Sequence, residues 1–147
     1  MTTEETRAFF DRYAHALSTA DRDTALTLVT DVLDHNGVRM TAAQWWADHV
    51  AANIACLEGY TWSIDELIVA GDRVTVRYTD TGTLIRPWVG LTDLGRPIAF
   101  REHAVYRLAA GRICEIWSVF DHWALVRPVD PGDPAGPAAA VDRGALA

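Results

Sequence analysis

Apolar side chains recur every three or four positions in the first part of the chain, the spacing of amphipathic helices. Thr2 and Glu5 have capping-box spacing and precede such an apolar stripe. The stripe consists of Phe10, Tyr13, Ala14 and Leu17. The pattern predicts a helix over residues 3–19. Asp21 or Asp23 can cap a second, shorter helix that runs to about residue 30.

A third helix is predicted after residues 32–37, a segment with the sequence VLDHNG that favours an extended or loop conformation. Thr41 and Gln44 form another capping box. The helix that follows reaches about residue 57 and stops at Gly59. Its apolar stripe begins at Trp46, and His49 lies on a neighbouring face.

After Gly59 the apolar period changes to two, which predicts four strands. They cover residues 61–70, 72–83, 95–108 and 112–121. Tight turns at 71–72 and 110–111 join the first pair and the last pair. The 84–96 connection is long and apolar, which is typical of a loop that covers a buried site. Helices followed by an antiparallel meander predict an α+β fold, with helices closing one side of a curved sheet.

The 147 residues fit one domain, which we expect to cover residues 1–127. Residues 128–147 are rich in Pro, Gly and Ala and predict a flexible tail. The first ten residues, MTTEETRAFF, have neither a basic region nor a long apolar run. A signal peptide or membrane span is therefore not expected, and the expected location is cytoplasmic.

Charge and composition disfavour several classes of function. The formal net charge of -7 argues against binding to nucleic acid or to an anionic membrane. All thirteen basic residues are Arg, so the chain has no lysine for Schiff-base catalysis. The histidines and the two cysteines lack the spacing of a metal site. We therefore expect a protein that works without a metal or another cofactor.

The last predicted hairpin brings a carboxylate next to aromatic rings. With 110–111 as a two-residue turn, residues whose numbers add up to about 221 lie opposite each other. In this register Trp117 and Asp121 share one face, which we expect to enter a buried pocket. Glu102 lies on the same face, but a bulge would exchange the two faces beyond it, so either His103 or Glu102 can face inward. Burial against aromatic rings raises a carboxyl pKa towards the range of general acid/base catalysis, but Asp121 can equally cap the next segment.

Further polar and aromatic residues can complete such a pocket. His35 and Asn36 offer a proton shuttle and an amide donor, although the sequence around them is also typical of a turn. Tyr13 can direct its hydroxyl inward or belong to the core. Six tryptophans suit an aromatic-lined pocket for a flat, apolar ligand. The expected substrate-binding side chains are Tyr13, Asn36, Trp46, Tyr78, Trp88, Phe100 and Trp117.

Three segments carry a more specific signal: GDRVTVRYTDTGT at 71–83, RPWVGLTDLGRPIAF at 86–100 and YRLAAGRICEIWSVFD at 106–121. Together with the DHN at 34–36, they resemble the SnoaL-like polyketide cyclases of the nuclear-transport-factor-2-like superfamily. The resemblance implies a cone-shaped α+β barrel, in which three N-terminal helices pack on a strongly curved antiparallel sheet around a deep apolar cavity. It also implies that Asp121 is the catalytic acid/base, with His35 and His103 as supporting catalytic groups.

The activity that the resemblance implies is that of a cofactor-independent cyclase. Such an enzyme closes a ring in a polyketide-type intermediate, by aldol or related C–C bond formation, in an apolar cavity. An isomerase or epoxide hydrolase on the same fold, or a non-catalytic small-molecule-binding protein, stays open as an alternative. The expected ligand is an apolar, polyketide-like small molecule. A sheet face carrying Val105, Ile116 and Phe120 suggests a homodimer or a higher homo-oligomer.

Overall fold

The computed structural model describes residues 1–126, so the predicted tail at 128–147 lies outside the described residues. Helix α1 (Thr3–Ser18) begins with the predicted capping box. The Thr2 hydroxyl accepts a hydrogen bond from the Glu5 backbone N–H at 3.1 Å, and the Glu5 carboxylate accepts one from the Thr2 backbone at 2.6 Å. Asp21 caps α2 (Arg22–Leu28), where its carboxylate accepts a hydrogen bond from the Thr24 backbone N–H at 3.0 Å. These two predicted helices are therefore confirmed.

The third helical segment is continuous but changes its winding. It consists of α3 (Ala42–Trp45), one wider π-helical turn η1 (Trp46–Ala51) and α4 (Ala52–Ile54). The predicted capping box of Thr41 and Gln44 opens it. Residue 57 was predicted as the helix end, but there the chain has already entered the first long strand. π-Turns are rare and often occur at functional sites.

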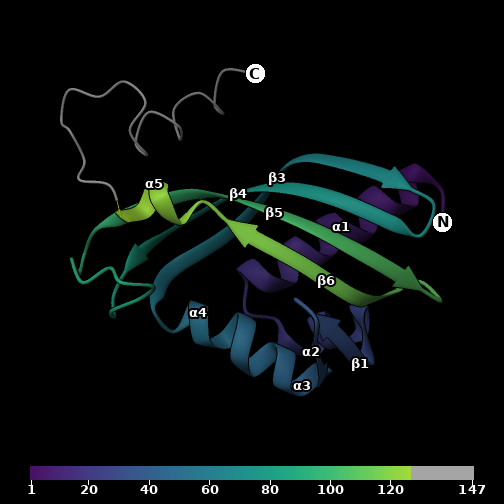
Figure 1. The fold of residues 1–147 in the computed structure, drawn as a ribbon, viewed down its shortest axis with the longest axis horizontal. Helices are drawn as coiled ribbons and strands as arrows, with labels where there is room; N and C mark the ends of the chain where they lie inside the picture. The colour runs from purple at the N-terminus through teal and green to yellow at the C-terminus, as the bar shows by residue number, and fades with distance from the viewer. Residues whose placement is uncertain (127–147) are drawn as a thin grey trace.

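Within residues 1–126, six strands form one sheet in the order β2-β1-β6-β5-β4-β3. Their bounds are β1 (Val29–His35), β2 (Val38–Thr41), β3 (Leu57–Ala70), β4 (Arg73–Leu84), β5 (Pro97–Ala109) and β6 (Arg112–Phe120). The four long strands are the predicted antiparallel meander, and the short helix α5 (His122–Val126) follows them. The α+β architecture of N-terminal helices on a sheet is confirmed (Figure 1).

The predicted antiparallel sheet is mixed instead, because β1 pairs with β6 in parallel. Residues 32–37 were predicted as extended or loop, and they form the end of β1 and its turn into β2. A strand as short as β1 contains few apolar positions. The alternation of apolar residues along the sequence therefore gave little indication of this strand. The strong curvature and cone shape stay a prediction.

One bulge decides which residues of the last hairpin face inward. The turn lies at Ala110-Gly111 as predicted, and Leu108 pairs with Ile113. The next pair is Arg107 with Glu115, so Cys114 is an extra residue on β6. Beyond this point β6 presents to the inside the face that the unbulged register had placed outside, whereas β5 keeps Phe100, Glu102 and Tyr106 on its inner face.

The helices cover the inner face of the sheet. Helix α1 packs on β3, and the segment from α3 to α4 reaches from β1 to β3 on the same side of the sheet (Figure 1). Phe10 and Trp45 are almost fully buried where these helices meet the strands, and the Tyr13 ring stacks on Trp45 with centroids 6.2 Å apart. Within residues 1–126, no helix has the length and apolar character needed to cross a membrane.

Candidate active site

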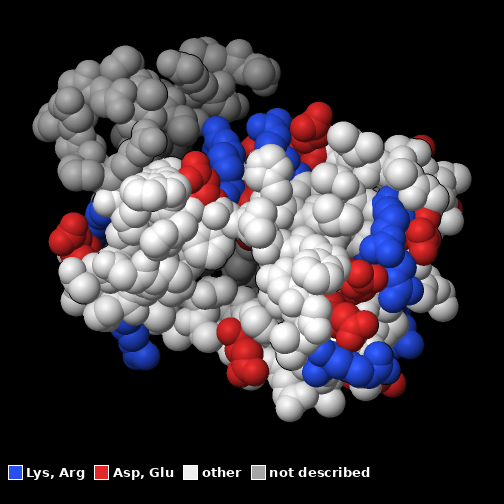
Figure 2. All heavy atoms as spheres, viewed as in Figure 1, with Lys and Arg blue, Asp and Glu red and all other residues white. Residues whose placement is uncertain are grey.

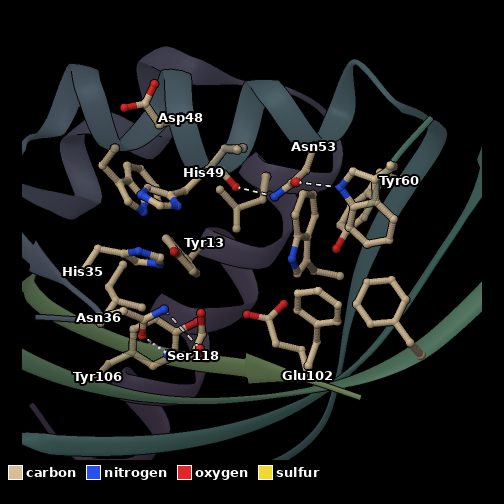
Figure 3. A pocket seen from close by; sticks show the side chains of 18 residues that line it. Tyr13, His35, Asn36, Asp48, His49, Asn53, Tyr60, Glu102, Tyr106 and Ser118 are labelled. Atoms are coloured by element: carbon tan, nitrogen blue, oxygen red, sulfur yellow. Dashed lines mark hydrogen bonds between the residues drawn. The ribbon is translucent and has the colours of Figure 1, made fainter. Parts of the chain in front are cut away.

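A cavity of about 280 Å³ lies between the inner face of the sheet and the helices (Figure 3). Many of its lining side chains are aromatic, and its polar groups come from both the helices and the strands. The lining side chains are Tyr13, Leu17, His35, Asn36, Trp45, Asp48, His49, Val50, Asn53, Tyr60, Trp62, Trp88, Phe100, Glu102, Tyr106, Ile116, Ser118 and Phe120. Its volume is near the lower end of the range for small-molecule sites.

A carboxylate stands on the sheet side of this cavity. Glu102 of β5 points its carboxyl group into the open space (Figure 3), because it alternates along the strand with Phe100 and Tyr106, which also line the cavity. Burial raises the pKa of Glu102, and contacts with Asp80 and Trp62 offset part of that rise. A carboxyl group with a raised pKa is suited to take and return protons near neutral pH.

Asp80 of β4 lies behind Glu102 and has no exposed surface. The Tyr60 hydroxyl donates a hydrogen bond to Asp80 Oδ2 at 2.8 Å. Burial raises the pKa of Asp80 well above its usual value, and the charge of Glu102 raises it further. The two carboxyl groups therefore form one interacting acid pair at the edge of the cavity.

Two histidines form the opposite wall. His35 ends β1 and His49 comes from η1, and their ring centroids are 3.9 Å apart. Burial, together with the charge of the neighbouring His49, lowers the pKa of His35 to about 4, and burial also lowers the pKa of His49. Both rings are therefore neutral at pH 7. His35 Nδ1 is buried and has no hydrogen-bond partner among the described residues, so it is free to bind a ligand.

The cavity carries carboxyl groups but no positive side chain to balance them. Among the described residues that line it, none is Arg. Figure 2 shows a hollow between β6 and the α3–α4 segment, with mostly uncharged atoms around it. Nowhere in residues 1–126 are three or more His, Cys, Asp or Glu side chains grouped to hold a metal ion. The arrangement offers one proton-transferring carboxylate and neutral imidazoles facing it across an aromatic space.

Five predicted site residues lie where the sequence placed them: Tyr13, His35, Asn36, Trp88 and Phe100 all line the cavity. Trp88 belongs to the 84–96 connection, so the predicted covering loop does contribute to the site. The Asn36 amide, however, is already paired, because it donates to the Ser118 carbonyl at 3.2 Å and accepts from the Ser118 N–H at 2.8 Å. It joins the β1–β2 turn to β6.

Two other predicted residues are buried outside the cavity. Trp46 packs in the core and is not part of the lining. Tyr78 lies behind the cavity wall, and its hydroxyl is 3.0 Å from the hydroxyl of Tyr106. The structure therefore does not bring these two predicted residues into the cavity. Tyr78 contacts the site through Tyr106, which does line the cavity.

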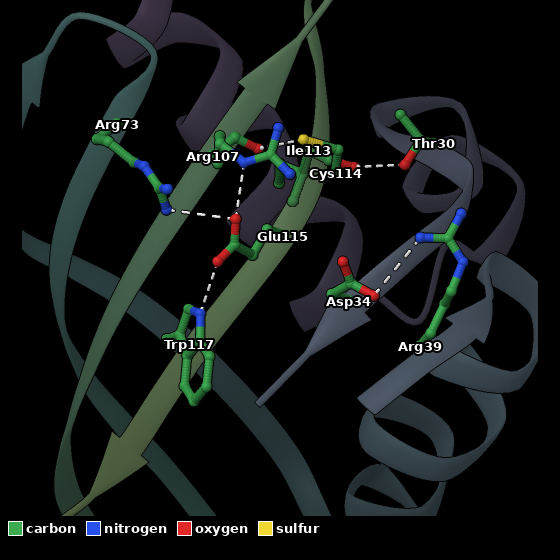
Figure 4. A network of polar contacts seen from close by, with 9 residues as sticks. All are labelled: Thr30, Asp34, Arg39, Arg73, Arg107, Ile113, Cys114, Glu115 and Trp117. Carbon is green, nitrogen blue, oxygen red and sulfur yellow. Dashed lines mark hydrogen bonds and ion pairs between the residues drawn. The ribbon is translucent and has the colours of Figure 1, made fainter. Parts of the chain in front are cut away.

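The predicted pocket of Trp117 and Asp121 is wrong as well, and the bulge at Cys114 is the reason. Trp117 is 50 % exposed on the outer face, and its Nε1–H donates to Glu115 at 2.7 Å (Figure 4). Asp121 is exposed, and its carboxylate accepts from the Ala124 N–H at 3.1 Å, the alternative capping role. His103 is exposed too, and it lies opposite Val119.

The same bulge changes the predicted oligomer face. Ile116 is buried and Phe120 lines the cavity, so neither belongs to the outer face. Val105 stays on that face, where Trp117 and Val119 join it as exposed apolar side chains. Beside them an ion-pair network joins Glu115 to two arginines of neighbouring strands (Figure 4).

Sequence reasoning missed Asp80, His49 and Tyr60 as site residues, and it placed Glu102 on the pocket face of the hairpin without assigning it a role. A signal for Asp80 was present, because Val74, Val76, Tyr78 and Asp80 alternate along β4. A carboxylate that continues such a buried alternation is unusual enough to mark a site. His49 gave no comparable signal, since its approach to His35 depends on the parallel strand β1.

A family model described as SnoaL-like polyketide cyclase matches residues 7–129 of the sequence. This match covers most of the chain. The chain belongs to the SnoaL-like polyketide cyclase family. The predicted resemblance is confirmed, and the NTF2-like architecture agrees with it. A comparison with curated proteins found no significant match.

Solved structures of other proteins share the fold of this chain. A SnoaL-like polyketide cyclase from Agrobacterium tumefaciens is 24 % identical, with a TM-score of 0.77, over 85 % of this chain and 96 % of the other. TsrD from Streptomyces laurentii is 17 % identical, with a TM-score of 0.76, over 85 % and 94 %. IdmH from Streptomyces antibioticus is 20 % identical, with a TM-score of 0.69, over 80 % and 92 %. At these identities the likeness concerns the fold.

Proposed function

We propose that this SnoaL-like chain is a cofactor-independent cyclase that closes a carbon–carbon ring in an apolar, polyketide-type intermediate. The observation that carries the proposal is the carboxyl group of Glu102, which points into an aromatic cavity beside a second buried acid. Membership of a polyketide cyclase family supports the type of substrate. Glu102 takes the acid/base role that the resemblance had implied for Asp121.

The reaction begins with proton transfer from carbon. Glu102, in its carboxylate form, removes an acidic proton from a carbon beside a carbonyl group and becomes a carboxylic acid. The resulting enolate carbon attacks a second carbonyl carbon of the same molecule, which forms the new C–C bond and leaves an alkoxide. The proton then returns from Glu102 to that alkoxide, so no cofactor or external acid is consumed.

The histidine pair stabilises the oxygen that becomes negative. His35 is neutral and has a free, buried Nδ1, which donates a hydrogen bond in the tautomer that carries its proton there. A neutral donor aimed at the enolate oxygen lowers the barrier without first binding the ground-state charge. The aromatic walls from Trp62, Trp88 and Phe100 hold the chain folded, so that its two reacting carbons meet.

A ring-closure assay tests this proposal. The substrates are aromatic esters with an acetoacetyl side chain, and the product is detected by mass spectrometry as an isomer or as its dehydrated form. Wild-type protein should form the ring, and Glu102→Gln should lose about a hundredfold or more of the rate. Asp121→Asn, which keeps the cap acceptor on an exposed residue, is the matched control and should keep full activity.

The outcomes also separate the alternatives. A product with a shifted double bond and no new ring would indicate an isomerase. Binding without any turnover would indicate a ligand-binding protein. Equal rates for wild type and Glu102→Gln, with both proteins folded, would refute the acid/base role of Glu102.

A further inference from the structure

Asp80 lies where neither water nor a positive charge reaches it. It is fully buried on β4, between Trp62 of β3 and Phe100 of β5 in the sheet register. One carboxyl oxygen, Oδ2, accepts the hydrogen bond from Tyr60. The other, Oδ1, is buried and has no hydrogen-bond partner within the described part of the chain. An ionised carboxylate left in that state would be costly.

The ionisable groups around Asp80 offer no compensation. Tyr60 contacts it from β3, and Glu102 faces it from β5. The exposed Asp65 of β3, which accepts a hydrogen bond from Thr79, adds a further negative charge nearby. The phenols around Glu102 come from α1, β3, β4 and β5, and burial raises the pKa of each, so they stay uncharged. These phenols are Tyr13, Tyr60, Tyr78 and Tyr106. Two carboxyl groups this close, in an apolar environment without a cation, cannot both be ionised, so one of them keeps a proton.

The geometry assigns the proton to Asp80. Its side chain has no exposed surface, whereas Glu102 opens into the cavity. With its proton on Oδ1, Asp80 accepts from Tyr60 at one oxygen and donates towards Glu102 from the other. In that arrangement both carboxyl oxygens of Asp80, including the buried Oδ1, take part in a hydrogen bond. Diagonal neighbours on adjacent strands are within reach of side chains of this length.

We propose that Asp80 is a carboxylic acid at neutral pH, and that it holds Glu102 as an ionised, correctly oriented base. Asp80 is thus a positioning residue that acts through Glu102, and its relevance to catalysis rests on the proposed function. A hydrogen bond donated to a carboxylate favours the charged form. Asp80 thereby keeps Glu102 available as a base although burial favours its protonated form.

Carboxyl ¹³C NMR of the full-length protein tests this assignment without any substrate. The side-chain carboxyls of Asp and Glu are labelled, and the Asp80 and Glu102 signals are assigned by their loss in Asp80→Asn and Glu102→Gln. We expect the Asp80 signal to stay at the chemical shift of a carboxylic acid through pH 7, where the Glu102 signal is that of a carboxylate. A carboxylate signal for Asp80 at pH 7 would overturn the proposal.

Two substitutions then separate positioning from mere packing. Asp80→Asn keeps an uncharged donor, so the titration midpoint of Glu102 should stay unchanged. Asp80→Ala removes the donor, and the midpoint should rise by about one pH unit. If Asp80 were ionised, Asp80→Asn would instead lower that midpoint. Asp65→Asn, an exposed acid on β3, is the control for general loss of charge.

These results are independent of turnover. If the titrations behave as expected while Glu102→Gln still closes the ring, the acid pair exists and the proposed function is wrong. If Asp80→Ala does not fold, the wild-type signal and the Asp80→Asn titration still decide the protonation state.

Discussion

His35 makes the stability of the protein depend on pH in a way that can be measured. Its pKa is about 4 in the folded protein because the ring is buried, and a histidine in an unfolded chain titrates near 6.5. Below pH 6.5 the unfolded chain binds a proton that the folded protein does not bind. The stability that neutral His35 contributes is therefore complete above pH 6.5, and it is lost as the pH falls towards 4.

The size of this effect follows from the two pKa values. At about 1.4 kcal/mol per pH unit, the gap from 6.5 to 4 corresponds to about 3 kcal/mol. Solvent in the cavity screens part of it, which leaves about 2 kcal/mol. The raised pKa values of Asp80 and Glu102 have the opposite sign, since they make the folded protein less stable as the pH rises. The effect of His35 is therefore measured as the difference between wild type and a His35 variant in how the free energy of unfolding changes with pH.

Urea denaturation at a series of pH values measures that difference. Between pH 7 and pH 4.5, wild type should lose about 2 kcal/mol more of its free energy of unfolding than His35→Gln does. His103→Gln, on the exposed outer face, is the matched control and should follow wild type. If the free energy of unfolding changes with pH in the same way for wild type and for His35→Gln, the buried neutral His35 does not cause the pH dependence, and the reasoning is refuted.

The other predictions concern packing and the outer face of the sheet. Trp88→Ala, which removes a buried ring stacked on the cavity wall, should cost about 3 kcal/mol or more in urea denaturation, while half-exposed Trp117→Ala should cost less than about 1 kcal/mol. Gly37→Ala should cost about 1–2 kcal/mol by the same assay, because Gly37 has a φ of +80° and an added Cβ would lie 3.3 Å from the Trp117 ring. Val119→Glu should convert the proposed homodimer to a monomer in light scattering, and a wild-type monomer would contradict that assembly.

Much of the fold could be predicted because its signals are local. The capping boxes at Thr2 and Thr41 set the helix starts, and the alternation after Gly59 predicted the four long strands. Each of these features depends on residues a few positions apart, so a single sequence displays them directly. The family motifs in the turns and in the 84–96 loop are local in the same sense.

The site could not be predicted as well, because it depends on contacts between distant segments. A single extra residue, Cys114, reversed the inward face of β6, which removed Trp117 and Asp121 from the cavity and left Glu102 of β5 as its carboxylate. His35 meets His49 only because β1 pairs in parallel with β6. Neither the bulge nor the parallel pairing changes the alternation of apolar residues enough to be recognised beforehand.

Proton exchange from carbon tests the role of Glu102 most directly, because it requires the base but no ring closure. The probe is an uncharged bicyclic β-keto ester, the methyl ester of a tetralone carboxylic acid, in deuterium oxide at neutral pH. NMR should show deuterium entering the acidic position faster with wild type and with Asp121→Asn than with Glu102→Gln, by about a hundredfold. Equal exchange by wild type and Glu102→Gln, or loss of exchange in Asp121→Asn alone, would contradict the assignment of the active site to the cavity around Glu102.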